Sequence, residues 1–124
     1  MPSAYRPQRN TTQFAAVEAN FYDKGEHKLF AKQVGDPVCG FHWIIKLRLH
    51  VLLAGTFAGR FQASDEVLAL SLDWPPRKPV KKLIEAFRRS GLLVRVKGKG
   101  SWWQYVDWEH TTTGYYQRKR AEDA

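Results

Sequence analysis

Basic side chains are concentrated between Arg77 and Lys99. Nine of the chain's 20 lysines and arginines fall in this segment, against one acidic residue, Glu85. A protein that neutralises phosphates releases the counterions condensed on a nucleic acid, so a dense group of cations favours a phosphate backbone as partner. The nine basic residues are Arg77, Lys78, Lys81, Lys82, Arg88, Arg89, Arg95, Lys97 and Lys99.

Side chains suited to catalysis or metal binding are sparse and scattered. Cys39 and His42 have the C-x-x-H spacing of half a zinc site, but no second close pair completes four ligands. Two acidic pairs, beginning at Asp65 and at Asp107, lack a convincing histidine partner or a glycine-rich phosphate loop. We therefore predict no catalytic residues, no bound metal, no cofactor and no enzymatic activity.

An amphipathic helix is predicted to present part of the basic segment. Between Val80 and Phe87, apolar residues recur at the spacing of one helical face, and charged residues occupy the opposite face. Pro79 suits a first helical turn, and Gly91 suits a left-handed C-terminal stop. The helix Pro79–Ser90 should turn one face to a core and a cationic face to solvent.

A β-hairpin is predicted directly after this helix. Residues 92–96 are short and β-branched enough for a strand, Lys97–Gly100 is a glycine-punctuated turn, and residues 101–106 form an aromatic return strand. A basic helix followed by a basic-tipped hairpin is the order of the last helix and the wing in a winged helix-turn-helix.

The preceding segments supply the other elements of that architecture. Val38–Ala54 is apolar nearly all round, which predicts a central buried helix with Lys46 and His50 at its solvent-facing gaps. Residues 55–61 then turn and form a very short strand. Ser64 can cap a helix of about two turns, which Asp73–Pro76 must break.

The ends of the chain are less regular. Residues 1–13 are interpreted as a flexible N-terminal arm, and Phe14–Tyr22 fits either a strand or a short helix. Asp23 can cap a short helix through Val34, which residues 35–37 end. Residues 111–124 form a basic polar C-terminal tail, which is expected to fray or to lead into a following segment. A winged-helix domain is expected to span residues 14–110.

These features together resemble the winged-helix domains of bacteriophage replication initiators, replisome organisers and related small prophage regulators. The resemblance covers roughly residues 14–120 and rests mainly on architectural motifs. The matching segments are Phe41–Gly55, Gly59–Phe61, Leu83–Leu93, Tyr105–Glu109 and the basic tail Tyr116–Arg120. It implies an α+β fold: a winged helix-turn-helix of three core helices and a small antiparallel sheet with a β-hairpin wing, plus an extra N-terminal segment. A role in replication initiation or transcriptional regulation is also implied.

Duplex DNA is the first expected partner. The helix Pro79–Ser90 would enter the major groove, and the wing would lie against phosphates or the minor groove. Arg77 is the best candidate to read a base, because its guanidinium matches the two acceptors of guanine. The alternative to DNA binding is an ordinary solvated helix face, on which Glu85 forms ion pairs with the neighbouring basic residues. The expected DNA-binding residues are Arg77, Lys78, Lys81, Lys82, Arg88, Arg89, Lys97 and Lys99.

A protein partner is the second expectation. Trp102 and Trp103 are adjacent on the return strand, so they point to opposite faces of the sheet and one can remain outside. Such a winged helix would inhibit or recruit a host replication or transcription protein. The other aromatic residues that could contact such a protein partner are Trp74 and Tyr105. The alternative is that the outer tryptophan packs beneath the N-terminal arm or the tail.

Length, composition and net charge indicate what broad class of protein this is. The chain of 124 residues has a net charge of +8, a pI near 9.8 and 44% hydrophobic residues, which suits one folded domain with an anionic partner. Cys39 is the single cysteine, which favours a reducing, cytoplasmic location. The longest apolar run, Ile44–Ala54, is interrupted by charge and too short to cross a membrane. A homodimer is a further expectation that the sequence does not fix.

Overall fold

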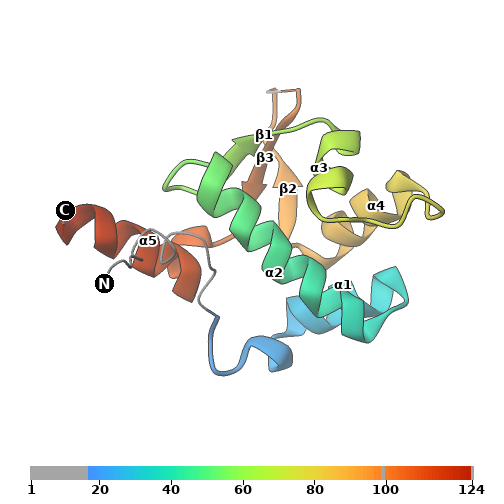
Figure 1. Ribbon diagram of the computed structural model, residues 1–124, viewed down its shortest axis with the longest axis horizontal. Helices are drawn as coiled ribbons and strands as arrows, with labels where there is room; N and C mark the ends of the chain where they lie inside the picture. Colours follow the sequence, from blue (N-terminus) through green and yellow to red (C-terminus); the bar gives the residue numbers. More distant parts are fainter. Residues whose placement is uncertain (1–16, 99, 124) are drawn as a thin grey trace, which may run out of the picture.

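The computed structural model describes residues 17–98 and 100–123 (Figure 1). Within these ranges the chain forms five α-helices and a small antiparallel sheet of three strands, so the predicted α+β class is confirmed. The elements in chain order are η2 Phe21–Asp23, α1 Gly25–Val34, α2 Pro37–Ala54, β1 Arg60–Gln62, α3 Asp65–Ser71, α4 Val80–Ser90, β2 Leu93–Arg95, β3 Trp102–Tyr105, η3 Trp108–His110 and α5 Thr112–Asp123.

Helix α2 is the central element that the sequence predicts. Asp36 caps it by accepting a hydrogen bond from the N–H of Cys39, and Pro37 occupies its first turn. By length and composition alone it is the one helix of the described residues that could cross a membrane. Its buried residues instead pack against α1, α3, α5 and β1. Figure 1 shows α2 between α5 on one side and α3 and α4 on the other.

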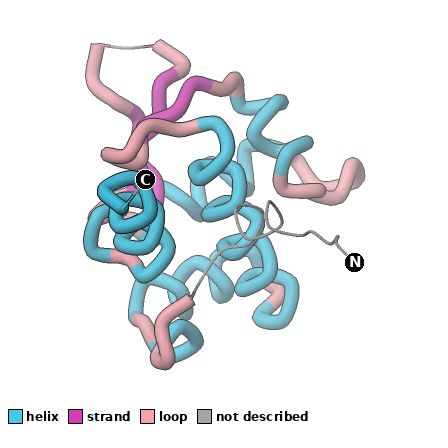
Figure 2. The backbone as a smooth tube through the Cα atoms, turned by 60° about the vertical axis from the view of Figure 1, so that its left-hand side comes forward, coloured by secondary structure: helices cyan, strands magenta, loops and turns pink. Residues whose placement is uncertain are grey.

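The three strands lie at one end of the molecule (Figure 2). Strand β3 is central and pairs with both β1 and β2, which gives the order β1-β3-β2. Phe61 and Trp103 are register partners on the inner face, and both are buried. The short strand after α2 and the two strands of the hairpin therefore form one sheet, as the sequence predicts.

Helices α3 and α4 begin and end where local signals place them. The Ser64 side chain accepts a hydrogen bond from the N–H of Val67, so Ser64 is the predicted cap of α3. Gly91 ends α4 with a φ of 75°, a left-handed conformation that glycine adopts without a Cβ clash. Pro79 lies one position before the helix, at the N-cap, rather than inside its first turn.

Helix α1 packs against both α2 and α4. The rings of Phe30 and Phe87 stack with centroids 4.8 Å apart, which joins α1 to the inner face of α4. The predicted cap of this helix is wrong, because Lys24 occupies the N-cap position and Asp23 ends the preceding 3-10 turn η2. The sequence of residues 14–22 fits either a strand or a short helix. Its last two residues, Phe21 and Tyr22, belong to the helical turn η2. Residues 14–16 lie outside the described part.

A buried ion pair joins distant segments of the chain. The guanidinium of Arg48 in α2 is fully buried, and it donates to both carboxylate oxygens of Glu18 at 2.8 and 2.9 Å. Its Nε donates to the hydroxyl of Tyr105 at 3.0 Å. The Glu18 carboxylate also accepts from the N–H of Thr112 at 2.7 Å and pairs with Lys24. The network links the N-terminal segment, α2, β3 and α5.

Helix α5 is a correction to the sequence prediction. The sequence predicts that segment 111–124 frays or leads into a following segment, whereas residues 112–123 form a helix that is held at its start. A Cβ on Gly114 would lie 2.0 Å from the carbonyl oxygen of Trp108, so the helix meets η3 at a distance that only glycine allows. Gln117 accepts a hydrogen bond from the indole of Trp108 and donates one to the carbonyl of Leu52.

Acidification is expected to lower the free energy of unfolding in two stages. Burial lowers the pKa of His27 and of His50 below the ordinary 6.5, so unfolding takes up protons and stability falls as pH drops below about 6.5. Burial alone would raise the pKa of Glu18, but hydrogen bonds and charge from Arg48, Thr112 and Lys24 hold it far below 4.5. This second contribution is complete above pH 4.5 and is lost as pH falls below it.

Urea unfolding midpoints at about pH 7, 5.5 and 3.5 would measure both stages. The His50→Gln variant should reduce the loss between the first two values, because one titrating imidazole has been removed. An unfolding midpoint that does not change between about pH 5.5 and 3.5 would contradict the role given to Glu18.

Candidate nucleic-acid interface

Helix α4 directs its basic residues to solvent. Leu83, Ala86 and Phe87 are buried against the core, which fixes the rotation of the helix about its axis. The four basic residues of the opposite face are all exposed: Lys81, Lys82, Arg88 and Arg89. The amphipathic pattern of the sequence therefore predicts this face correctly.

Glu85 divides the cationic face of α4 into two parts. Its carboxylate accepts hydrogen bonds from Arg88 and, at 3.5 Å, from Arg89. The hydrogen bond from Arg88 is the main reason that the pKa of Glu85 lies below its usual value. Lys81 and Lys82 have no ion pair within the described residues. The end of α4 nearer its N-terminus is consequently the more strongly cationic end.

A hollow of about 350 Å³ lies beside this end of α4. Lys81, Lys82, Glu85 and Arg89 line it from α4, and Gln33 lines it from α1. The cationic face of α4 thus has α1 as a neighbour along one side. This arrangement follows from the packing of α1 on α4, which no local sequence signal indicates.

The loop between α3 and α4 carries two of the expected DNA-binding residues. Arg77 is exposed and has no ion pair in the described part of the chain. The Lys78 ammonium lies 5.7 and 5.5 Å from the ring centroids of Trp43 and Trp74, within cation–π range. Trp74 also donates its indole N–H to the carbonyl of Lys78. Lys78 therefore contributes to the packing of this loop, whereas Arg77 stays open to solvent.

The basic residues of the hairpin loop and of strand β2 differ in their electrostatic environment. Lys97 is exposed at the tip, and Lys99 lies outside the described residues. Arg95, the last residue of β2, pairs with Asp65 of α3, and its guanidinium lies 4.3 Å from the centroid of Trp103. Arg95 therefore links the hairpin to α3 through an ion pair, and the Asp65 carboxylate largely compensates its charge.

The tryptophan pair of β3 is divided between the two faces of the sheet. Trp103 is buried and donates its indole N–H to the carbonyl of Ala63 at 2.9 Å. Trp102 is half-buried on the outer face, where it borders a hollow of about 190 Å³. Trp74 and Tyr105 are buried as well. Of these four aromatic candidates, Trp102 is the one that a partner can contact in this conformation.

Basic residues of α1 were not considered in the sequence interpretation. Lys28 and Lys32 are four residues apart and exposed on one side of α1. Their spacing in the sequence is the signal that could have identified them, because residues four apart are neighbours on a helix surface.

Within the described ranges, no group of three or more His, Cys, Asp or Glu side chains is placed to hold a metal ion. Cys39 is exposed, and the Asp36 side chain near it raises the pKa of its thiol.

Comparisons of the chain with protein-family models, with curated proteins and with solved structures found no match.

Proposed function

We propose that this protein binds duplex DNA through a winged helix-turn-helix. The observation that carries the proposal is the exposed, uncompensated cationic end of α4. Lys81 and Lys82 lie there without an ion pair in the described residues, and Arg77 is exposed in the preceding loop. A phosphate backbone compensates such a group of charges through many weak contacts at once.

The element order supports a winged helix as the scaffold for this surface. The sequence of α2, β1, α3, α4 and the β2–β3 hairpin matches the order helix, strand, two helices and wing. In the proposed complex, α4 enters the major groove and the hairpin tip with Lys97 approaches the phosphates. The loop of residues 72–79 is longer than the tight turn of simple repressors, and Trp74 fills the space beneath it.

The basic residues divide into three roles in this proposal. Arg77 is the candidate base reader, since a guanidinium can donate two hydrogen bonds to guanine. Lys81, Lys82 and Lys97 contact phosphates. Arg88 and Arg89 contribute less, because Glu85 already accepts their hydrogen bonds. The resemblance to phage replication and regulatory proteins suggests that binding serves replication initiation or transcriptional control.

Removing the Glu85 charge tests the proposal through a gain of affinity. We expect Glu85→Gln to bind a fluorescent duplex of random sequence about fivefold more tightly. That factor corresponds to roughly 1 kcal/mol, the Coulomb energy of unit charges about 4 Å apart in water. The gain has two sources: a like charge near phosphate is removed, and Arg88 and Arg89 are released. Fluorescence anisotropy at low salt measures the change.

Glu109→Gln is the matched control for this experiment. Glu109 is exposed in η3 and has no ion pair within the described residues, so its substitution changes the net charge equally but away from α4. The proposal requires a clearly smaller gain for Glu109→Gln than for Glu85→Gln. Equal gains would mean that only the overall charge matters, and no binding by either variant or by the wild type would refute the proposal.

A further inference from the structure

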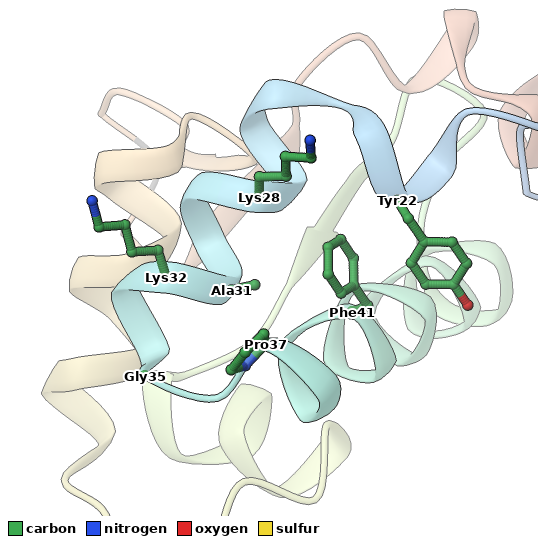
Figure 3. A pocket seen from close by; sticks show the side chains of 7 residues that line it. All are labelled: Tyr22, Lys28, Ala31, Lys32, Gly35, Pro37 and Phe41. Atoms are coloured by element: carbon green, nitrogen blue, oxygen red, sulfur yellow. The ribbon is translucent and has the colours of Figure 1, made fainter.

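A pocket between α1 and the start of α2 lies outside the proposed DNA-binding surface. It has a volume of about 520 Å³, within the usual range for binding sites of about 300–1,000 Å³ (Figure 3). Its apolar part is formed by Ala31, Pro37, Phe41 and the ring of Tyr22. Figure 3 shows Phe41 between the two helices and Tyr22 beside it on the turn that precedes α1.

Lysines form the rim of this pocket. Lys28 and Lys32 both line it from α1. Lys28 has only a long, exposed contact of 3.8 Å with Asp23, and Lys32 has no ion pair in the described residues. The Lys82 ammonium also lies nearby, 3.9 Å from the position that a Cβ on Gly35 would occupy. An apolar floor with a cationic rim is complementary to a ligand in which negatively charged groups flank an apolar group.

A second hollow continues the surface along α2. It has a volume of about 420 Å³ and shares Tyr22, Pro37 and Phe41 with the first pocket. The rings of Tyr22 and Phe41 meet edge to face with centroids 5.0 Å apart, and they separate the two hollows. Val38 is 81% exposed at the second hollow. Two adjacent apolar hollows suit an elongated occupant with two apolar side chains.

We infer that this groove, defined by the two hollows, docks an acidic amphipathic segment of a partner protein. Two apolar side chains of the segment occupy the hollows, and its carboxylates pair with Lys28 and Lys32. This is the helix-in-groove mode of recognition, in which apolar anchors recur on one face of a peptide. The inference does not depend on duplex binding, because no residue assigned to the DNA surface lines either hollow.

The charge distribution argues against other occupants. A symmetric dimer through this groove would bring the lysines of two chains together, and each chain has a net charge of +8. A nucleic acid would satisfy the lysines but has no apolar side chains for the hollows. An acidic segment of a different protein satisfies both parts of the surface.

The test measures binding of a labelled peptide to the full chain. The probe is a peptide of about twelve residues with Leu and Phe at i, i+4 spacing and Asp and Glu elsewhere, and the control peptide replaces the acids with Lys. We expect binding of the acidic peptide alone. Lys28→Glu/Lys32→Glu should weaken it at least about tenfold, because the charge complementarity is reversed.

Val38→Glu tests the apolar part of the groove. Val38 lies in the exposed first turn of α2, where an acidic residue is favourable, so this variant should keep its fold and lose peptide affinity while duplex binding changes little. Absence of peptide binding, or equal binding by wild type and both variants, would overturn the inference. Self-association of the wild type that Val38→Glu abolishes would also overturn it, since the occupant would then be a second copy.

Discussion

Lys81→Glu/Lys82→Glu is expected to bind a random duplex at least about 100-fold more weakly than the wild type at about 50 mM salt. Two phosphate contacts are lost, and two repulsive charges take their place. Both side chains are exposed and unpaired within the described residues, so the fold should be unaffected. Fluorescence anisotropy gives the affinity, and circular dichroism confirms that the helices are retained.

Arg118→Glu/Lys119→Glu provides the control with the same change in net charge. These residues lie on α5, on the opposite side of α2 from α4 (Figure 1). We expect a much smaller loss of duplex affinity. A loss as large as that of the α4 variant would mean that DNA responds to the charge of the whole molecule, and α4 would have no special role.

Arg48→Met is expected to have the largest effect on stability, about 3–5 kcal/mol, as for other buried ion pairs from which one partner is removed. The half-buried carboxylate of Glu18 would lose both hydrogen bonds from the guanidinium, and the hydroxyl of Tyr105 would lose its donor. The contacts that join α2 to the N-terminal segment and to β3 would weaken together. Urea denaturation followed by circular dichroism measures the loss.

Two further variants separate a specific role of this network from a general effect on α2. Glu18→Gln in the Arg48→Met background should recover part of the lost stability, because a neutral amide replaces a carboxylate that retains only Lys24 and the N–H of Thr112 as partners. Lys46 lies on the same helix as Arg48 and pairs with Asp73 of the loop after α3. Lys46→Met breaks this solvent-accessible pair and should cost no more than about 1 kcal/mol. Comparable losses for Lys46→Met and Arg48→Met would contradict this account of the network.

Local signals in the sequence predicted the elements that carry the candidate interface. Apolar spacing predicted the inner face of α4, and Gly91 predicted its end. Ser64 predicted the start of α3, and the alternation in β3 predicted that Trp102 and Trp103 lie on opposite faces. These predictions succeeded because each depends on residues within a few positions of one another.

Contacts between distant segments were not accessible to the same reasoning. Glu18 and Arg48 are 30 positions apart, and nothing in either segment indicates the other. The helix α5 depends on Gly114 fitting against Trp108, and its polar sequence alone suggested a tail. Helical spacing allows Glu85 to pair with any of four basic residues of α4. In the folded helix its carboxylate pairs with Arg88 and Arg89. Burial of Arg48 shows that a charged residue in an apolar helix can face the core when its partner comes from elsewhere.

The salt dependence of duplex binding tests the central claim most directly. If Lys81, Lys82 and Lys97 each neutralise one phosphate, log affinity should fall linearly with log salt with a slope of about −2.7. Affinity should then drop about 40-fold between about 50 and 200 mM salt. Folded protein that shows no duplex binding at low salt, or binding without salt dependence, would contradict the claim that this cationic surface holds DNA.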